Sequence, residues 1–216
     1  MLVNQWMSRE VIRAAPEDTL AAAIERMVRA RVRRLLVEDN GQAIGVLARS
    51  DVLRAGPAGA NPFSALGLCA GFGMPVREAM SRVVVSVPPD MPIEDAARLM
   101  NSRKIGILPV VSGGRTVGVL TRSDLSRAFI AMLGEDEAGL RISFDITDTE
   151  DAVAFSVSLA GRHGMRLASV STFTIDGRRS AVVRLIGVER AGMVDEIWKT
   201  GHRVLSVVRR TKDGGP

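Results

Sequence analysis

The residues best placed to do chemistry form a short motif that occurs twice, as Arg49-Ser50-Asp51 and as Arg122-Ser123-Asp124. In the second occurrence Thr121 precedes the motif, so a hydroxyl and a carboxylate lie three residues apart. Each motif follows an apolar run that predicts a strand and begins a segment that predicts a helix. A carboxylate at such a junction can accept hydrogen bonds from a pair of sugar hydroxyls, and the N-terminus of the helix behind it attracts phosphate.

The same motif also has a purely structural interpretation. Ser, Thr and Asp are common at helix starts, where their oxygens accept hydrogen bonds from free backbone N–H groups. Either Ser50 or Asp51 would suffice for this, so both copies should cap their helices equally well. Ligand binding through a hydroxyl and a carboxylate would instead favour the second copy, because the first has Ala48 where the second has Thr121. We therefore expect the main site at Asp124 and a weaker or empty site at Asp51.

No residue pattern in the sequence predicts catalysis. His163 and His202 lie 39 residues apart, without a cysteine or a third histidine nearby to complete a zinc site. Cys69, the one cysteine, lies in an apolar segment with no neighbouring histidine, where a thiol is usually inert. The sequence lacks the Gly-x-x-x-x-Gly-Lys-Ser/Thr loop of nucleotide hydrolases. We expect no catalytic residue, no metal site and no obligatory cofactor.

An internal repeat organises the first two thirds of the chain. A shift of 73 residues aligns Val3–Ala55 with Val76–Ala128 without a gap, and 19 of the 53 positions are identical. Such self-similarity indicates a duplication. A unit of about 50 residues buries too little surface alone. The two copies should therefore pack face to face about a pseudo-two-fold axis, with clefts between them.

Each copy predicts the same order of elements. A short β-rich run, Val11-Ile12 or Val83–Val85, comes first, and a helix with an apolar stripe at i, i+3, i+4 and i+7 follows. Two strands come next, joined by Asn40-Gly41 or Gly113-Gly114, which supply the positive φ angles of a type I′ hairpin. A last helix begins at the repeated motif. The helix stripes consist of Leu20, Ala23, Ile24 and Met27 in the first copy and of Ile93, Ala96, Ala97 and Met100 in the second.

This order, together with the Leu108-Pro109-Val110 strand and the run from Gly118 to Asp124, resembles tandem CBS domains, the Bateman module. The resemblance covers residues 2 to about 133. It implies an α/β fold in which a CBS-domain pair has a first domain at residues 1–60, a linker at 61–74 and a second domain at 75–133. It also implies an adenine nucleotide or an S-adenosyl compound bound in the clefts, and regulation of partners without chemistry.

The resemblance assigns a role to each part of the expected ligand. The ribose would be bound by Asp124, and the ribose or the α-phosphate by Thr121. The base would lie against the backbone around Val84 and the apolar wall at Ile105.

Arg33 and Arg34 are the best candidates for binding the phosphates. They align with Gly106 and Ile107, a place where this family often carries basic residues that reach phosphates. In the alternative interpretation they are ordinary surface charges beside the acidic pair Glu38-Asp39.

Residues 138–211 predict a second, ferredoxin-like (βαββαβ) domain. Alternation from Leu140 to Ile146 indicates its first strand, and a helix should begin near Thr149. Asp176-Gly177 indicates a hairpin between the next two strands. The remaining elements are strands at Arg166–Ile175 and Ser180–Val188, a helix with Met193, Val194, Ile197 and Trp198 on one side, and a strand at Arg203–Arg210.

This element order resembles an ACT domain, a small-molecule sensing module, and the whole chain resembles the acetoin-utilisation protein B type of bacterial protein. ACT domains that bind amino acids usually carry a glycine after the first strand, where this chain reads Asp145 to Thr149 without one. We therefore assign the domain to homodimerisation. Two such sheets can pair edge to edge or face to face, and edge pairing would cover backbone groups that otherwise invite aggregation.

The charge distribution and composition narrow the class of protein. The formal charge of +5 arises before residue 134, because residues 134–216 carry twelve Lys/Arg and twelve Asp/Glu. No basic run is longer than two residues, and with 4% aromatic residues the chain has few platforms for stacking single-stranded nucleic acid. The uncharged stretch Gly56–Pro75 is broken by Gly and Pro, and the start lacks the order of a signal peptide. We expect a cytoplasmic protein without a membrane span.

Together these observations predict a non-catalytic, ligand-sensing regulator. AMP, ATP or a related adenosyl compound would bind in the CBS cleft, and occupancy would act through a homodimer on an unidentified regulated protein. Two alternatives remain open. One is a ligand-free interaction scaffold. The other, less favoured, is a nucleic-acid-binding regulator with strongly salt-dependent binding, which would use Arg29, Arg31, Arg33 and Arg34.

Overall fold

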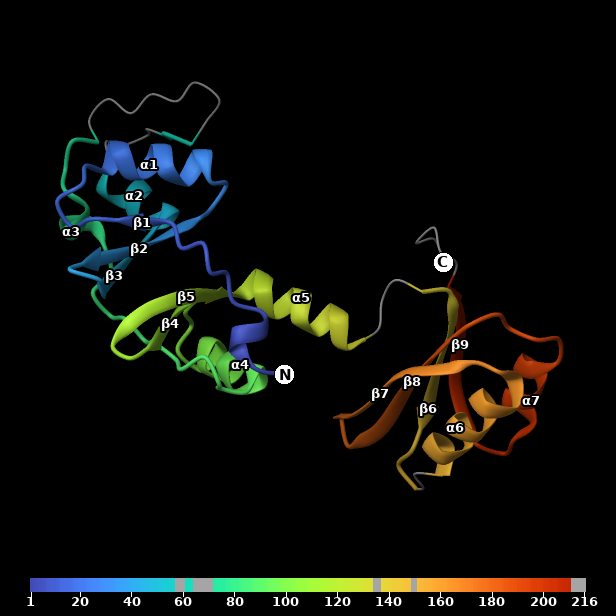
Figure 1. The fold of residues 1–216 in the computed structure, drawn as a ribbon. Helices are drawn as coiled ribbons and strands as arrows, with labels where there is room; N and C mark the ends of the chain where they lie inside the picture. The colour runs from blue at the N-terminus through green and yellow to red at the C-terminus, as the bar shows by residue number, and fades with distance from the viewer. Residues whose placement is uncertain (57–60, 64–71, 134–136, 149–150, 211–216) are drawn as a thin grey trace. The chain divides into compact units, whose positions relative to one another are not determined.

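The computed structural model describes residues 1–56, 61–63, 72–133, 137–148 and 151–210. Its contacts divide the chain into two compact units, Met1–Arg127 and Ala128–Pro216. The first unit contains both copies of the repeat, and the second contains a four-stranded sheet with two helices (Figure 1).

The first copy forms a three-stranded sheet covered by helices. β1 (Arg13–Ala14) runs parallel to β2 (Arg34–Asp39), which pairs antiparallel with β3 (Gln42–Ala48). α1 (Leu20–Arg29) and α2 (Arg49–Ala55) lie on the same side of this sheet (Figure 1). All four residues of the predicted α1 stripe are buried in the core of this half, so the predicted amphipathic helix is confirmed.

The second copy repeats this arrangement with a smaller sheet. β4 (Ile107–Ser112) pairs antiparallel with β5 (Arg115–Thr121), between α4 (Ile93–Ser102) and α5 (Arg122–Met132) in sequence. Three residues of the predicted α4 stripe are buried, and Ala97 is half-buried. The hairpin turns are also confirmed, because both of their central residues have positive φ: 49° and 80° in Asn40-Gly41, and 57° and 75° in Gly113-Gly114.

The first β-rich run of each copy pairs later than predicted. β1 begins at Arg13, beyond Val11-Ile12, and Val83–Val85 forms no strand, since pairing there is limited to a bridge between Val87 and Val110. The prediction of strands at these earlier residues is wrong. The chain pairs with its own sheet at Arg13–Ala14 in the first copy and at Val87 in the second, and Val11 packs instead against residues of the other half.

The first segments of the two copies are exchanged. η1 (Val3–Gln5) begins the first copy, but Val3 is fully buried in the core of the second. α3 (Val76–Ala79) begins the second copy, but Val76 is buried in the core of the first. The backbone N–H of Ser8 donates to the Val119 carbonyl at 2.9 Å, and that of Ser81 donates to the Val46 carbonyl at 2.9 Å. The exchange follows the predicted pseudo-two-fold symmetry.

A small apolar cluster joins the two halves. The sheets face each other in Figure 1, with α1 and α4 on their outer sides. Two residues from each half, both of them buried, meet between the sheets: Val11 and Leu36 from the first, and Ile107 and Val119 from the second. Of the linker residues, Phe72 is buried in the core of the first half and Phe63 packs against it, while Leu66 and Leu68 lie outside the described residues.

The second unit has the predicted ferredoxin-like topology. Its sheet has the order β7-β8-β6-β9, all antiparallel, and both helices pack on one face of it. The elements are β6 (Gly139–Asp145), α6 (Asp151–His163), β7 (Arg166–Ile175), β8 (Arg178–Ile186), α7 (Met193–Lys199) and β9 (Arg203–Arg210). Among the described residues, none of the helices in either unit is long and apolar enough to cross a membrane.

Two details of the second unit differ from the prediction. β8 ends at Ile186, because Gly187 turns the chain with a φ of 134° and leaves Val188 exposed. In α7, Met193 and Ile197 are buried but Trp198 is 53% exposed. Residues four apart share one face of a helix, whereas the next residue lies well round the helix axis from that face. The predicted helix start at Thr149 lies outside the described residues.

Candidate functional site

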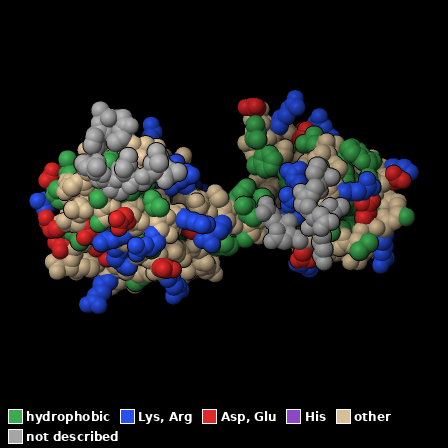
Figure 2. Space-filling model, turned by 90° about the horizontal axis from the view of Figure 1, so that it is seen from above, with side chains coloured by type: hydrophobic (Ala, Val, Ile, Leu, Met, Phe, Trp, Pro, Cys, Tyr) green, Lys and Arg blue, Asp and Glu red, His purple; other side chains and the backbone are tan. Residues whose placement is uncertain are grey.

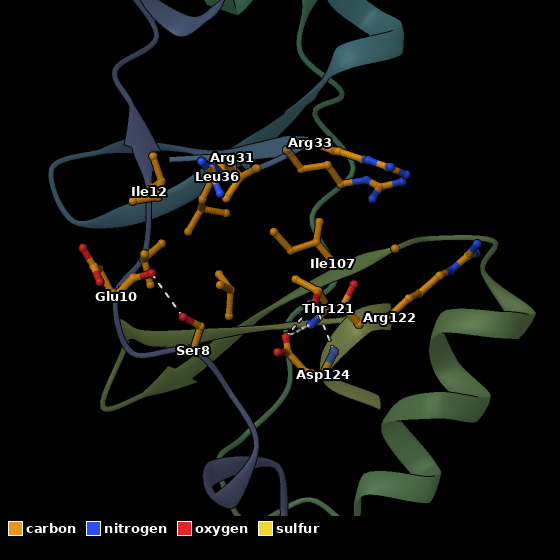
Figure 3. A pocket seen from close by; sticks show the side chains of 16 residues that line it. Ser8, Glu10, Ile12, Arg31, Arg33, Leu36, Ile107, Thr121, Arg122 and Asp124 are labelled. Atoms are coloured by element: carbon orange, nitrogen blue, oxygen red, sulfur yellow. Dashed lines mark hydrogen bonds between the residues drawn. The ribbon is translucent and has the colours of Figure 1, made fainter. Parts of the chain in front are cut away.

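A cavity of about 670 Å³ opens between the two halves of the first unit (Figure 3). Its lining comes from residues 8–12, from residues 31–36 around the start of β2, and from the ends of β4 and β5 with the first turn of α5. Small-molecule sites in proteins usually measure about 300–1,000 Å³. The cavity therefore has the size and the mixed lining of a site for a nucleotide-sized molecule.

The sequence motif lies on one wall of this cavity. Thr121 ends β5, and Asp124, only 5% exposed, lies in the first turn of α5. Asp124 Oδ2 accepts hydrogen bonds from the Thr121 backbone N–H at 2.7 Å and from Thr121 Oγ1 at 2.6 Å (Figure 3). The other oxygen, Oδ1, pairs with Arg127. The carboxylate thus caps α5 and borders the cavity at the same time.

The first copy has the same cap without the hydroxyl. Asp51 Oδ2 accepts a hydrogen bond from the Ala48 backbone N–H at 2.9 Å, and Oδ1 lies 3.5 Å from Arg54. Asp51 does not line the 670 Å³ cavity. Both aspartates therefore cap the start of a helix, but only Asp124 borders this cavity.

Four guanidinium groups give the cavity a positive lining. Arg31, Arg33, Arg34 and Arg122 all line it, against the carboxylates of Glu10 and Asp124. Within the described ranges, none of the four arginines forms an ion pair with a carboxylate. Unpaired guanidinium groups around one cavity favour an anionic ligand, and above all phosphate, which arginine can bind through two parallel hydrogen bonds.

Gly106 provides the space that one of these arginines occupies. A Cβ added there would lie 2.9 Å from Cζ of Arg34, so a side chain at this position would displace the guanidinium group. The predicted alignment of Arg33 and Arg34 with Gly106 and Ile107 thus corresponds to four residues that meet at the same cavity.

Arg31 holds an unusual backbone conformation. Its φ is 53°, and Lys104, the equivalent residue of the second copy, has a φ of 54°. Each residue follows the C-cap of a helix and adopts the left-handed conformation, and the next N–H, that of Val32 or Ile105, donates back to the helix at 3.0 Å. The conformation costs a non-glycine residue about 1–2 kcal/mol.

The structure places the two predicted base contacts elsewhere. Val84 and Ile105 do not line this cavity, whereas Val11 and Val32, the residues 73 positions earlier, do. The reason is the exchange between the halves: residues 8–12, near the start of the first copy, complete the cleft beside Asp124. Sequence reasoning missed three further lining residues for the same reason: Ser8, Glu10 and Ile12.

Other kinds of site find little support in the described structure. No group of three or more His, Cys, Asp or Glu side chains is placed to hold a metal ion among the described residues. On the face shown in Figure 2, the Lys and Arg side chains of the described residues are interspersed with Asp and Glu. This face lacks the continuous basic stripe that is typical of a duplex-binding surface.

Comparison with known proteins confirms the predicted resemblance to tandem CBS domains. The sequence matches the CBS domain family twice, at residues 3–58 and 76–131. It is 29% identical over 138 residues to the CBS domain-containing protein YhcV of Bacillus subtilis, covering 63% of this chain and 89% of that protein. It is 32% identical over 150 residues to an inosine-5'-monophosphate dehydrogenase of Halobacterium salinarum, covering 67% of this chain but only 28% of that enzyme.

Solved structures show the same fold. The structure of a Vibrio cholerae protein named as an acetoin utilization protein (AcuB) matches with a TM-score of 0.52 and 30% identity, over 62% of this chain and 93% of that chain. A Methanocaldococcus jannaschii protein described as an archaeal homologue of g-AMPK matches with a TM-score of 0.51 and 25% identity, over 59% and 47% of the two chains. The chain spans a third or less of several curated relatives, at 33%, 30% and 28% of their lengths.

Proposed function

This chain belongs to the CBS domain family, and we propose that it is a regulator that binds an adenine nucleotide in the cavity between its CBS domains. Membership of this family supports the predicted role of a regulatory module that would bind an adenosine ligand. One observation carries the proposal for this chain: four arginines without an ion pair among the described residues line the cavity that Asp124 borders.

Each part of the nucleotide has a suitable partner in the proposed complex. The arginines would bind the phosphates. Asp124 would bind the ribose, since Arg127 is the one partner of its Oδ1 among the described residues, and this exposed arginine can yield to a ribose hydroxyl. Val11 and Val32 would contact the base in this cavity. Because the first segment of each copy packs on the other half, Val84 and Ile105 would line a second, weaker site beside Asp51.

We further propose that the second unit is an ACT-like domain that joins two chains in the cytoplasm. Its edge strands, β7 and β9, have no partner on one side within the described sheet, and β7 exposes Phe173 and Ile175. Pairing with a second copy would cover both the free backbone groups and these side chains. Nucleotide binding can then regulate a partner only if the ligand prefers one arrangement of the dimer.

One observation favours a second candidate function, that of a ligand-free scaffold. Both carboxylate oxygens of Asp124 already have protein partners in the cap, so the fold alone accounts for the residue. A scaffold predicts that the unfolding temperature is insensitive to every nucleotide.

Calorimetric titration of the full chain with AMP, ADP, ATP and S-adenosylmethionine tests the proposed function. We expect binding of the phosphorylated compounds and weaker binding of the cationic sulfonium compound, because the cavity lining is positive. Absence of heat with all four, in a folded sample, would count against the proposal.

Asp124→Ala and Asp51→Ala form a matched pair of variants for the same titration. Each removes one cap and should cost about 1–2 kcal/mol of stability. Only Asp124→Ala should abolish the binding of AMP, because Asp51 lies outside the cavity. Equal loss of AMP binding in both variants would show that the effect comes from the caps and not from ribose recognition.

A further inference from the structure

A second cavity, of about 360 Å³, shares a wall with the first. Both cavities are lined by the consecutive residues Arg31, Val32 and Arg33. Met27 and Val28 of α1, Arg49 at the start of α2 and Phe63 complete the described lining of the smaller cavity.

The described lining of the smaller cavity is cationic. Among the described residues, it includes Arg31, Arg33 and Arg49 and no Asp or Glu. In the part of the chain that the structure describes, none of the three forms an ion pair with a carboxylate. Three like charges around one small cavity repel one another unless an anion lies among them.

Arg49 is held in position by two contacts. Its backbone N–H donates to the Arg33 carbonyl at 3.0 Å, which fixes the start of α2 beside the shared wall. Its guanidinium group lies over the ring of Phe63, 4.0 Å from the ring centroid. A guanidinium group can stack on an aromatic face while its N–H donors remain free in the plane. Arg49 can therefore present donors to an anion without losing its packing.

We propose that the smaller cavity is a subsite for the distal phosphates of a nucleoside di- or triphosphate whose adenosine lies in the larger cavity. This inference rests on the proposed function and names the ligand class more closely. Arg31 and Arg33 contact both cavities and so would bind the middle of the phosphate chain, while Arg49 contacts only the distal end. The volume is near the lower limit for a drug-sized ligand, about 300 Å³, and suits a phosphate group better than a second nucleoside. Affinity should therefore rise from AMP to ADP to ATP.

The test is calorimetric titration of the full chain with AMP, ADP, ATP and inorganic tripolyphosphate, in buffer with EDTA so that no divalent cation neutralises the phosphates. Arg49→Ala should weaken ATP binding about tenfold, the effect of one charge-assisted hydrogen bond, and should leave AMP binding within about twofold. Arg29→Ala is the control, because it removes an exposed arginine of α1 that lines neither cavity. It should leave the binding of every compound unchanged.

Phe63→Leu supplies a second variant that keeps the arginine. It removes the ring under Arg49 but keeps an apolar side chain, so it should weaken ATP binding less than Arg49→Ala and leave AMP binding unchanged. Circular dichroism and the unfolding temperature check that both variants fold.

The outcomes separate this inference from the proposed function. If wild type binds AMP and ATP equally, or if Arg49→Ala weakens both equally, the subsite is overturned while nucleotide binding stands. If no adenosine compound binds but tripolyphosphate binds and depends on Arg49, the anion subsite stands and the proposed function fails. If neither tripolyphosphate nor any nucleotide binds, both are overturned.

Discussion

At the scale of single residues, Arg31 has a backbone conformation that glycine adopts more easily. Its φ of 53° and the φ of 54° at Lys104 are equivalent features of the two repeats, and each residue ends a helix. Their surroundings differ, because Arg31 lines both cavities and Lys104 lines neither. Because Lys104 adopts the same conformation without lining a cavity, helix termination accounts for the backbone conformation of both residues. Any effect of Arg31 on binding must then come from its side chain.

Arg31→Gly and Lys104→Gly should have the same effect on stability and different effects on binding. Both relieve the left-handed conformation, so stability should stay the same or rise by about 0.5–1 kcal/mol in urea unfolding. Only Arg31→Gly should weaken ATP, by about tenfold in calorimetry, since it removes a guanidinium group from the phosphate path. A similar loss of affinity in Lys104→Gly would mean that the backbone change, and not the charge, controls binding.

At the scale of elements, short sequence patterns predicted the hairpin turns and the amphipathic helices, because local forces determine both. The hairpins follow from the positive φ that Asn40-Gly41 and Gly113-Gly114 adopt, and the helices follow from stripes that a sheet can bury. The exchange of η1 and α3 has no such signal. A helical segment of three or four residues is too short to show a hydrophobic periodicity. Because the two copies are similar, such a segment could pack equally well on its own half or on the other. For this reason the sequence could predict that Thr121 and Asp124 border a cavity, but it could not distinguish Val11 and Val32 from Val84 and Ile105 as the apolar lining of that cavity.

The exchanged segment should contribute to the core of the second half. Val3 is fully buried beside Val87 and Leu108, although these residues lie far away in sequence. Val3→Ala removes two buried methyl groups and leaves a small cavity, which should lower the free energy of unfolding by about 2 kcal/mol. Leu2→Ala is the neighbouring control, because Leu2 is 38% exposed and its truncation should cost at most about 0.5 kcal/mol. Equal effects in urea unfolding would contradict the exchange.

At the scale of the whole molecule, the two units have separate hydrophobic cores. The largest cluster of the second unit draws all its buried residues from positions 140–197, and the clusters of the first unit end at Leu120. Both cavities of the proposed site are lined only by residues of the first unit. Ligand binding should therefore stabilise the first unit directly and leave the stability of the second unit unchanged. This difference can be measured if the two units unfold separately.

Differential scanning calorimetry should resolve two unfolding transitions in the full chain. At a free nucleotide concentration of about 100 times Kd, binding adds about 2.7 kcal/mol to the stability of the unit that holds the site. For a unit of this size, that free energy raises the transition by roughly 5–15 °C. Val3→Ala should lower the same transition, because Val3 lies in the same unit, so the variant identifies which transition the ligand shifts. If nucleotide and Val3→Ala move different transitions, the ligand does not bind between the CBS domains.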